Sequence, residues 1–114
     1  MIIGIGCDIV EIARITNVID KPVIQKLLSE KEQTIANQFP LARKSEWIAG
    51  RMAAKEAIYK AIHTVEECQF WNIEILVNED GTPCVTSFPA YDIMVSIAHE
   101  KEYAVAYAIV QTKG

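Results

Sequence analysis

The 114-residue chain has little of what marks a membrane, secreted or nucleic-acid-binding protein. No apolar run approaches the roughly 20 residues that cross a bilayer. Because the first residues read as a strand without a basic segment before it, we expect no signal peptide. Lysine and arginine (11) are outnumbered by aspartate and glutamate (15), which gives a net charge of −4. This balance argues against a broad surface for nucleic acid or anionic membrane, so we expect neither as a partner.

Cysteine is also scarce. Cys7, Cys68 and Cys84 are an odd number and lack the C-x-x-C spacing of metal and redox sites. These features exclude a disulfide framework and a zinc site of ordinary spacing. We expect three reduced, buried thiols and a cytoplasmic protein. Packing roles are also expected for Trp47 and Trp71.

What the sequence does contain is typical of one globular domain spanning residues 1–114. Hydrophobic residues make up 51% and charged residues 23%, and the length allows one sizeable core but leaves little room for a second. The first half has helical spacing of apolar residues, and the second half alternates. Helices are predicted over residues 11–20, 22–28, 30–39 and 42–62, and strands over residues 1–10, 73–77, 83–86, 93–99 and 103–110.

These elements predict an α+β fold in which helices pack on a mostly antiparallel sheet. The stretch Ser29–Glu32 has the form of a capping box, which starts a helix. In the last strand, alanines alternate with larger residues, so one face carries only Ala104, Ala106 and Ala108. Such a face allows a helix or another subunit to approach closely.

The first strand contains an acid, Asp8, within the apolar stretch GIGCDIV. An ionised carboxylate there costs free energy unless hydrogen bonds, a counter-charge or a metal compensate it. The alternative is that Asp8 ends the strand and caps a helix starting at Glu11, since aspartate is a preferred cap. Spacing alone favours the cap.

A second charged stretch, RMAAKEAIYK, falls within the longest predicted helix. At about 100° per residue, the alanines share one packing face, and the other half carries the charged side chains of Arg51, Lys55, Glu56 and Lys60. Arg51 and Lys55 are like charges at i,i+4, a pair that destabilises a helix slightly unless an anion lies nearby. The alternative is an ordinary solvated face with a weak ion pair between Glu56 and Lys60.

Taken together, Asp8 and Glu56 change this assessment. Two carboxylates from distant segments, completed by phosphates and water, are a common way for proteins to hold Mg²⁺. The segments GIGCDIVEIARI, RMAAKEAIYKAI and VSIAHEKEYAVAYAIV stand in the same order and near the same positions in holo-acyl-carrier-protein synthases, the short-chain phosphopantetheinyl transferases. The chain resembles this family over nearly its whole length.

The resemblance implies the phosphopantetheinyl transferase fold and the family's reaction. In that reaction the 4′-phosphopantetheine arm of coenzyme A passes to a serine of an apo acyl carrier protein, as in fatty acid biosynthesis, and adenosine 3′,5′-bisphosphate is released. It also implies dependence on Mg²⁺ and a homotrimer with active sites between subunits. The partners would be coenzyme A and the carrier protein.

The same resemblance implies roles for individual residues. Asp8 and Glu56 would bind the metal and, with Lys60, form the catalytic set. Coenzyme A would be bound by Arg51, Lys55, Lys60 and His99, the last reaching the nucleotide from a neighbouring subunit. Arg14 would face the carrier protein. Which group accepts the serine proton stays open among Glu56 acting through a metal-associated water, Asp8 and Lys55.

The chain departs from the family pattern after the charged helix. Where relatives carry a glycine-rich turn, residues 63–67 read HTVEE, and Ala98 and Glu100 flank His99 in place of small hydroxyl residues. Side chains there restrict close backbone approach, so the departures bear on coenzyme A affinity more than on metal binding. His63 is expected at the surface or as a helix C-cap. The alternative functions are a catalytically impaired relative that binds carrier proteins, and a trimeric interaction protein without catalysis.

Overall fold

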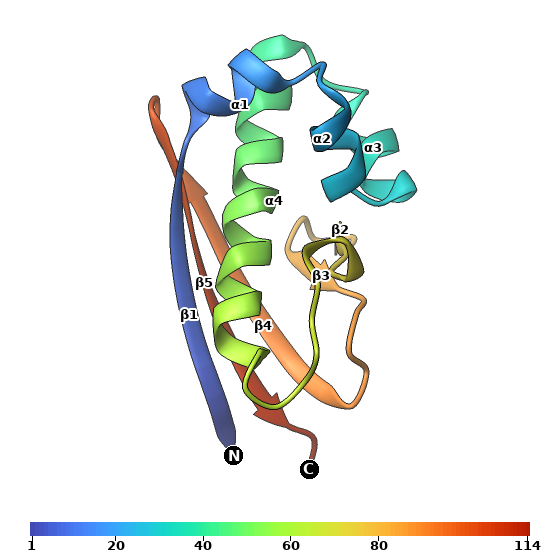
Figure 1. Cartoon of the computed structure of the whole chain (residues 1–114), viewed down its shortest axis with the longest axis vertical. Coiled ribbons are helices and arrows are strands. Elements are labelled where there is room, and N and C mark those ends of the chain that lie inside the picture. The colour runs from blue at the N-terminus through green and yellow to red at the C-terminus, as the bar shows by residue number, and fades with distance from the viewer.

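The structure, a computed structural model, describes all 114 residues (Figure 1). A 22-residue helix lies along a three-stranded sheet, and three short helices and a small hairpin complete the molecule. The elements are β1 (Ile2–Glu11), α1 (Ile12–Val18), α2 (Pro22–Leu27), α3 (Glu30–Ala36), α4 (Leu41–Ile62), the 3₁₀ helix η1 (Phe70–Asn72), β2 (Ile75–Val77), β3 (Pro83–Val85), β4 (Tyr91–His99) and β5 (Tyr103–Thr112).

The main sheet is antiparallel with the strand order β1-β5-β4. Helix α4 covers one face of it (Figure 1). The alanine face of β5 lies in this interface, with Ala104, Ala106 and Ala108 all buried. The predicted α+β class, the antiparallel sheet and the close approach of a helix to these alanines are confirmed.

Strand β1 approaches α4 even more closely. A β-carbon at Gly4 would overlap the carbonyl oxygen of Ala61, and one at Gly6 would overlap the carbonyl oxygen of Ala57. Only glycine fits at these two positions, because main chain meets main chain there. The glycines of the first strand therefore serve contact with the helix.

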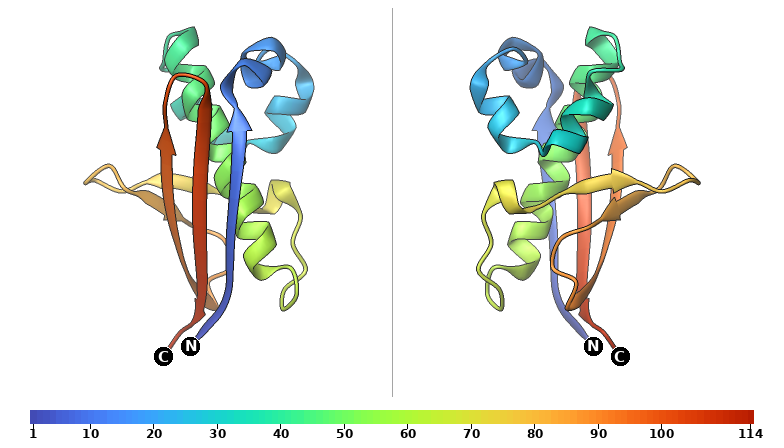
Figure 2. Two further views of the ribbon diagram at one scale, coloured as in Figure 1. Left: turned by 90° about the vertical axis from the view of Figure 1, so that its left-hand side faces the viewer. Right: turned by 90° about the vertical axis from the view of Figure 1, so that its right-hand side faces the viewer.

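The other face of the sheet has no cover. Figure 2 shows β1, β5 and β4 in front of α4, with no helix over their outer side. Large apolar side chains from all three strands are exposed on it: Ile5, Ile9, Met94, Tyr103 and Tyr107. None of the helices is both long enough and apolar enough to pass through a bilayer.

Asp8 is not a helix cap, the alternative that spacing alone favoured, because β1 continues to Glu11 and Asp8 pairs with Ala106 in the sheet. Three predictions of buried or packed side chains were wrong. Cys7 is exposed, since strand alternation places it on the uncovered face, and Cys84 is only half-buried. Trp71 is 64% exposed on η1.

Other local predictions are confirmed. The capping box forms: the Glu32 amide donates to Ser29 Oγ, and the Ser29 amide donates to Glu32 Oε1. Trp47 is buried. His63 is the C-cap residue of α4, and its ring stacks on Tyr59 with 5.1 Å between centroids.

Candidate active site

Two open cavities lie on different sides of α4, and the predicted site residues divide between them. The first, which we call the carboxylate cavity, has a volume of about 470 Å³. Strand β1 contributes Asp8 to it, α1 contributes Arg14, and α4 contributes Glu56. Apolar side chains such as Leu27, the last residue of α2, form the rest of its wall.

Asp8 has a counter-charge in this structure. Lys60 Nζ lies 3.3 Å from Asp8 Oδ1 and also donates to the Cys7 carbonyl oxygen at 3.1 Å. The Lys60 side chain is 48% exposed and that of Asp8 23% exposed, so solvent screens the pair and its net stabilisation is small. The lysine is therefore free to exchange this partner for another anion.

Glu56 makes no hydrogen bond or ion pair through its carboxylate. With Asp8 it supplies two hard oxygen ligands to one cavity. No cluster of three or more histidine, cysteine or acidic residues exists that could hold a metal by protein groups alone. Two carboxylates with open coordination positions fit Mg²⁺, which keeps water and phosphate oxygens among its ligands.

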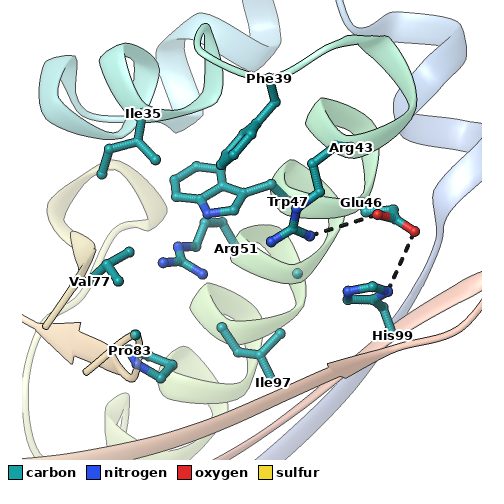
Figure 3. Close-up of a pocket in the computed structure, with 12 residues that line it drawn as sticks. Ile35, Phe39, Arg43, Glu46, Trp47, Arg51, Val77, Pro83, Ile97 and His99 are labelled. Carbon is teal, nitrogen blue, oxygen red and sulfur yellow. Dashed lines mark ion pairs between the residues drawn. The ribbon is translucent and has the colours of Figure 1, made fainter. Parts of the chain in front are cut away.

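The second cavity, which we call the guanidinium cavity, has a volume of about 480 Å³. Figure 3 shows Arg43 and Arg51 reaching into it from α4, with His99 at the end of β4. The Arg51 guanidinium lies 4.2 Å from the centre of the Trp47 ring, and its Nε donates to the Ile75 carbonyl oxygen at 3.1 Å. An aromatic wall beside fixed cations suits a planar, anionic ligand.

Charge in the guanidinium cavity is partly balanced from within. Glu46 lies 3.7 Å from Arg43 and 3.5 Å from His99 Nδ1 (Figure 3). Burial lowers the pKa of Arg51 to about 10, and the charge of Glu32 opposes that shift. Arg51 thus stays protonated at neutral pH. The sequence prediction missed Arg43 and Glu46, although their helical spacing to Trp47 and Arg51 was visible.

Lys55 lies in neither cavity. Its side chain is fully buried, its Nζ lies 2.6 Å from Glu32 Oε1, and it donates to the Leu27 carbonyl oxygen at 2.7 Å. Burial lowers the pKa of Lys55, and Glu32 opposes that shift. The alternative of a solvated helix face does not hold for Arg51 and Lys55, because α2, α3 and the hairpin cover that side.

The structure therefore brings Asp8, Glu56 and Arg14 together, with Lys60 joined through Asp8, and separately brings Arg51 and His99 together. The two cavities share no lining residue. Within one chain, the predicted residues do not form one continuous site.

Comparison with known proteins decides the family. The family model of the 4′-phosphopantetheinyl transferase superfamily matches residues 4–108. The chain belongs to this superfamily. Among curated relatives, the holo-[acyl-carrier-protein] synthase of an Exiguobacterium species is 42% identical and that of Bacillus cereus 39% identical, covering 100% and 98% of this chain and 96% and 98% of those proteins. The resemblance drawn from the sequence motifs is confirmed.

Solved structures of superfamily members agree. The holo-(acyl-carrier-protein) synthase of Bacillus anthracis in complex with CoA (3′,5′-ADP) superimposes with a TM-score of 0.91 at 37% identity, covering 99% of both chains. The Helicobacter pylori synthase in complex with coenzyme A gives 0.80 at 29% identity, covering 94% of this chain and 99% of that one. The phosphopantetheinyl transferase fold is confirmed.

Proposed function

We propose that this protein is an enzyme that transfers the 4′-phosphopantetheine group of coenzyme A to a serine of an apo acyl carrier protein, with Mg²⁺ as cofactor. The observation on which this proposal depends is the carboxylate cavity, where an unpartnered Glu56 and a weakly paired Asp8 lie near a half-exposed cation, Lys60. Full-length relatives that are holo-[acyl-carrier-protein] synthases support the same reaction.

The residues suit displacement at a pyrophosphate phosphorus. That reaction mainly needs positioning and neutralisation of negative charge on the phosphate oxygens. Asp8 and Glu56 would hold the Mg²⁺, which when bound neutralises phosphate charge. Lys60 would leave Asp8 and donate to a phosphate oxygen, and the carrier protein supplies the serine nucleophile. The group that accepts the serine proton stays open among Glu56 acting through a metal-associated water, Asp8 and Lys55, and complete burial argues against Lys55.

For the nucleotide we propose the guanidinium cavity. Arg51 and His99, the predicted residues, line it together with Arg43. The two guanidinium groups match the phosphates of a nucleotide, and Trp47 offers an apolar wall. Since the two cavities lie on different sides of α4, we propose that one coenzyme A spans two chains, with its pyrophosphate at the carboxylates of one and its nucleotide in the cavity of the next.

That arrangement requires an oligomer, and we propose the homotrimer implied by the family resemblance. The uncovered apolar face of the main sheet supports a subunit interface there. For the carrier protein we propose the exposed Arg14 as a contact, since it lies at the rim of the carboxylate cavity. A cytoplasmic location stays a prediction from the sequence.

Mass spectrometry of an apo acyl carrier protein tests the proposal. After incubation with this protein, coenzyme A and Mg²⁺, the carrier should gain the mass of one phosphopantetheine group on serine. Glu56→Gln is the matched control, and with it the carrier should gain mass about 10²–10³-fold more slowly. A carrier that binds the wild-type protein but never gains mass would overturn the transferase and leave the impaired, carrier-binding relative.

A further inference from the structure

The buried Glu32–Lys55 pair holds four segments at one point. Lys55 Nζ, on α4, binds Glu32 Oε1 and donates to the carbonyl oxygen of Leu27 at the end of α2. Glu32, on α3, accepts from the amide of Ser29 through Oε1 at 2.8 Å and from the amide of Ile75 in β2 through Oε2 at 2.9 Å. Both side chains are fully buried.

The β2–β3 hairpin depends on this point because it forms its own two-stranded sheet. The main chain of Ile75 is held on both sides: its amide donates to Glu32, and its carbonyl oxygen accepts from Arg51 Nε. The hairpin in turn contributes Val77 and Pro83 to the wall of the guanidinium cavity. The contacts of Ile75, together with the packing of β3 against β4, therefore set the position of that wall.

Lys55 connects the pair to the wall of the carboxylate cavity through Leu27. Lys55 satisfies the carbonyl oxygen of Leu27, a group at the end of a helix that has no partner within the helix. The side chain of Leu27 lines the carboxylate cavity beside Glu56. The pair thus contacts segments that shape both cavities, Lys55 through Leu27 and Glu32 through Ile75, and neither residue lines a cavity itself.

Movement of Lys55 into a cavity would be unfavourable. It would leave the Glu32 carboxylate buried without its counter-charge, and an unpaired buried charge is strongly destabilising. Lys60 has no such restriction, because it is half-exposed and its partner Asp8 faces the cavity. The two lysines of the same motif are therefore suited to different tasks.

We propose that Glu32 and Lys55 are a positioning pair, which sets the hairpin and the end of α2 against α4 and so aligns both cavities, and that Lys55 does not contact coenzyme A. The kinetic consequences of this inference rest on the proposed function. The structural claim, that the pair positions the hairpin and the end of α2, does not depend on it. The inference assigns Glu32 a role in the activity although it lies in neither cavity.

Kinetics of four variants test the pair. Lys55→Met and Glu32→Leu should each lower kcat/KM by roughly 10- to 100-fold, the scale on which misplacement by about 1 Å acts. Each should raise KM for the carrier protein and for coenzyme A together. The double variant Glu32→Leu/Lys55→Met should be no worse than either single variant, because one interaction is lost in all three. Lys60→Met, the control, should lower transfer without changing thermal stability.

Direct contact between Lys55 and coenzyme A predicts a different pattern. Lys55→Met would then weaken coenzyme A binding in calorimetry and leave KM for the carrier unchanged, Glu32→Leu would spare both constants, and the effects would add. That pattern would overturn the proposal. If Lys55→Met does not fold, the double variant, which buries no unpaired charge, carries the comparison with wild type.

Amide hydrogen exchange gives a readout that does not depend on transfer. The Ile75 amide should exchange at least tenfold faster in Glu32→Leu than in wild type, while the Asp8 amide in β1 should keep its rate. Ser29→Ala, which removes the cap hydroxyl and leaves the ion pair, should not accelerate exchange at Ile75. An unchanged Ile75 rate in Glu32→Leu overturns the positioning pair even if the protein proves to have no transferase activity.

Discussion

Lys55 and Lys60 stand five residues apart on α4 and in opposite environments. Lys55 is fully enclosed, with its ammonium group held by Glu32 and by the Leu27 carbonyl oxygen. Lys60 is half-exposed and shares only a screened pair with Asp8 at the edge of the carboxylate cavity. Two lysines of the same helix therefore have different roles: Lys55 forms a buried ion pair in the interior, and Lys60 lies at an open cavity. The short helices α2 and α3 make this difference, because they cover one side of α4 only.

The largest effect expected from this comparison is on stability. Lys55→Met leaves the Glu32 carboxylate buried and unpaired, and breaking a buried pair costs about 3–5 kcal/mol. Lys60→Met removes a screened pair, which contributes less than about 1 kcal/mol. Urea unfolding of both variants measures the two losses. Equal losses in the free energy of unfolding would mean that the buried pair of Lys55 contributes no more to stability than the exposed pair of Lys60.

The next effect is on transfer, at the open cavity. Asp8→Ala and Glu56→Gln should each lower kcat by about 10²–10³-fold, the range found when one group that stabilises transition-state charge is removed. Thermal stability should stay near that of wild type, because neither side chain is fully buried. Unfolding of either variant at room temperature, without any loss specific to Mg²⁺, would make that acid structural.

A smaller effect is expected at the rim. Arg14→Glu should raise KM for the carrier protein by roughly fivefold, the upper range for an exposed ion pair, and leave KM for coenzyme A unchanged. The increase should shrink in 0.5 M salt, where charges at the surface are screened. Lys101→Glu, an exposed residue between β4 and β5, is the matched control. An equal rise in both constants for Arg14→Glu would place Arg14 at the nucleotide or in the fold.

The smallest effect concerns pH. Hydrogen bonds from the hydroxyls of Ser29 and Thr86 lower the pKa of Glu74, whose Oε1 accepts from Thr86 Oγ1 at 2.8 Å. Since the pKa is lower in the folded state, this carboxylate stabilises the protein above its ordinary pKa of 4.5, and the contribution is lost as pH falls through the folded value. Glu74→Gln should lower the Tm slightly at pH 7 and by less at pH 3. The same difference at both pH values would exclude the charge as its cause.

Sequence periodicity predicted most of the fold because its main elements are long and regular. The alternation in β5 and the alanine spacing in α4 each mark one face, and those faces meet in the core. The predictions for Trp71 and Cys7 were wrong because residue type alone does not show whether another segment covers that face of the helix or strand. Covering depends on contacts between distant segments.

The charged residues show this limit most sharply. Helical spacing placed Arg51, Lys55 and Lys60 on one half of α4, and nothing local indicated that Glu32, 23 residues before Lys55, would meet it. The capping box identified Glu32 correctly as a helix-start residue. Glu32 also neutralises the buried Lys55. That contact depends on how α3 packs against α4, and residue spacing within one segment carries no information about such packing.

The contact of Gly4 and Gly6 with α4 has a consequence for how the carboxylate cavity tolerates change. Gly6 precedes Asp8 by two residues, and the carbonyl oxygen that it faces belongs to Ala57, the neighbour of Glu56. Contact between main-chain atoms of β1 and α4 therefore sets the distance between Asp8 and Glu56. Gly6 itself has no side chain that could act as an adjustable spacer. Substitutions of core residues elsewhere would leave this distance unchanged. A single methyl group added at Gly6 would overlap the carbonyl oxygen of Ala57 and so increase it.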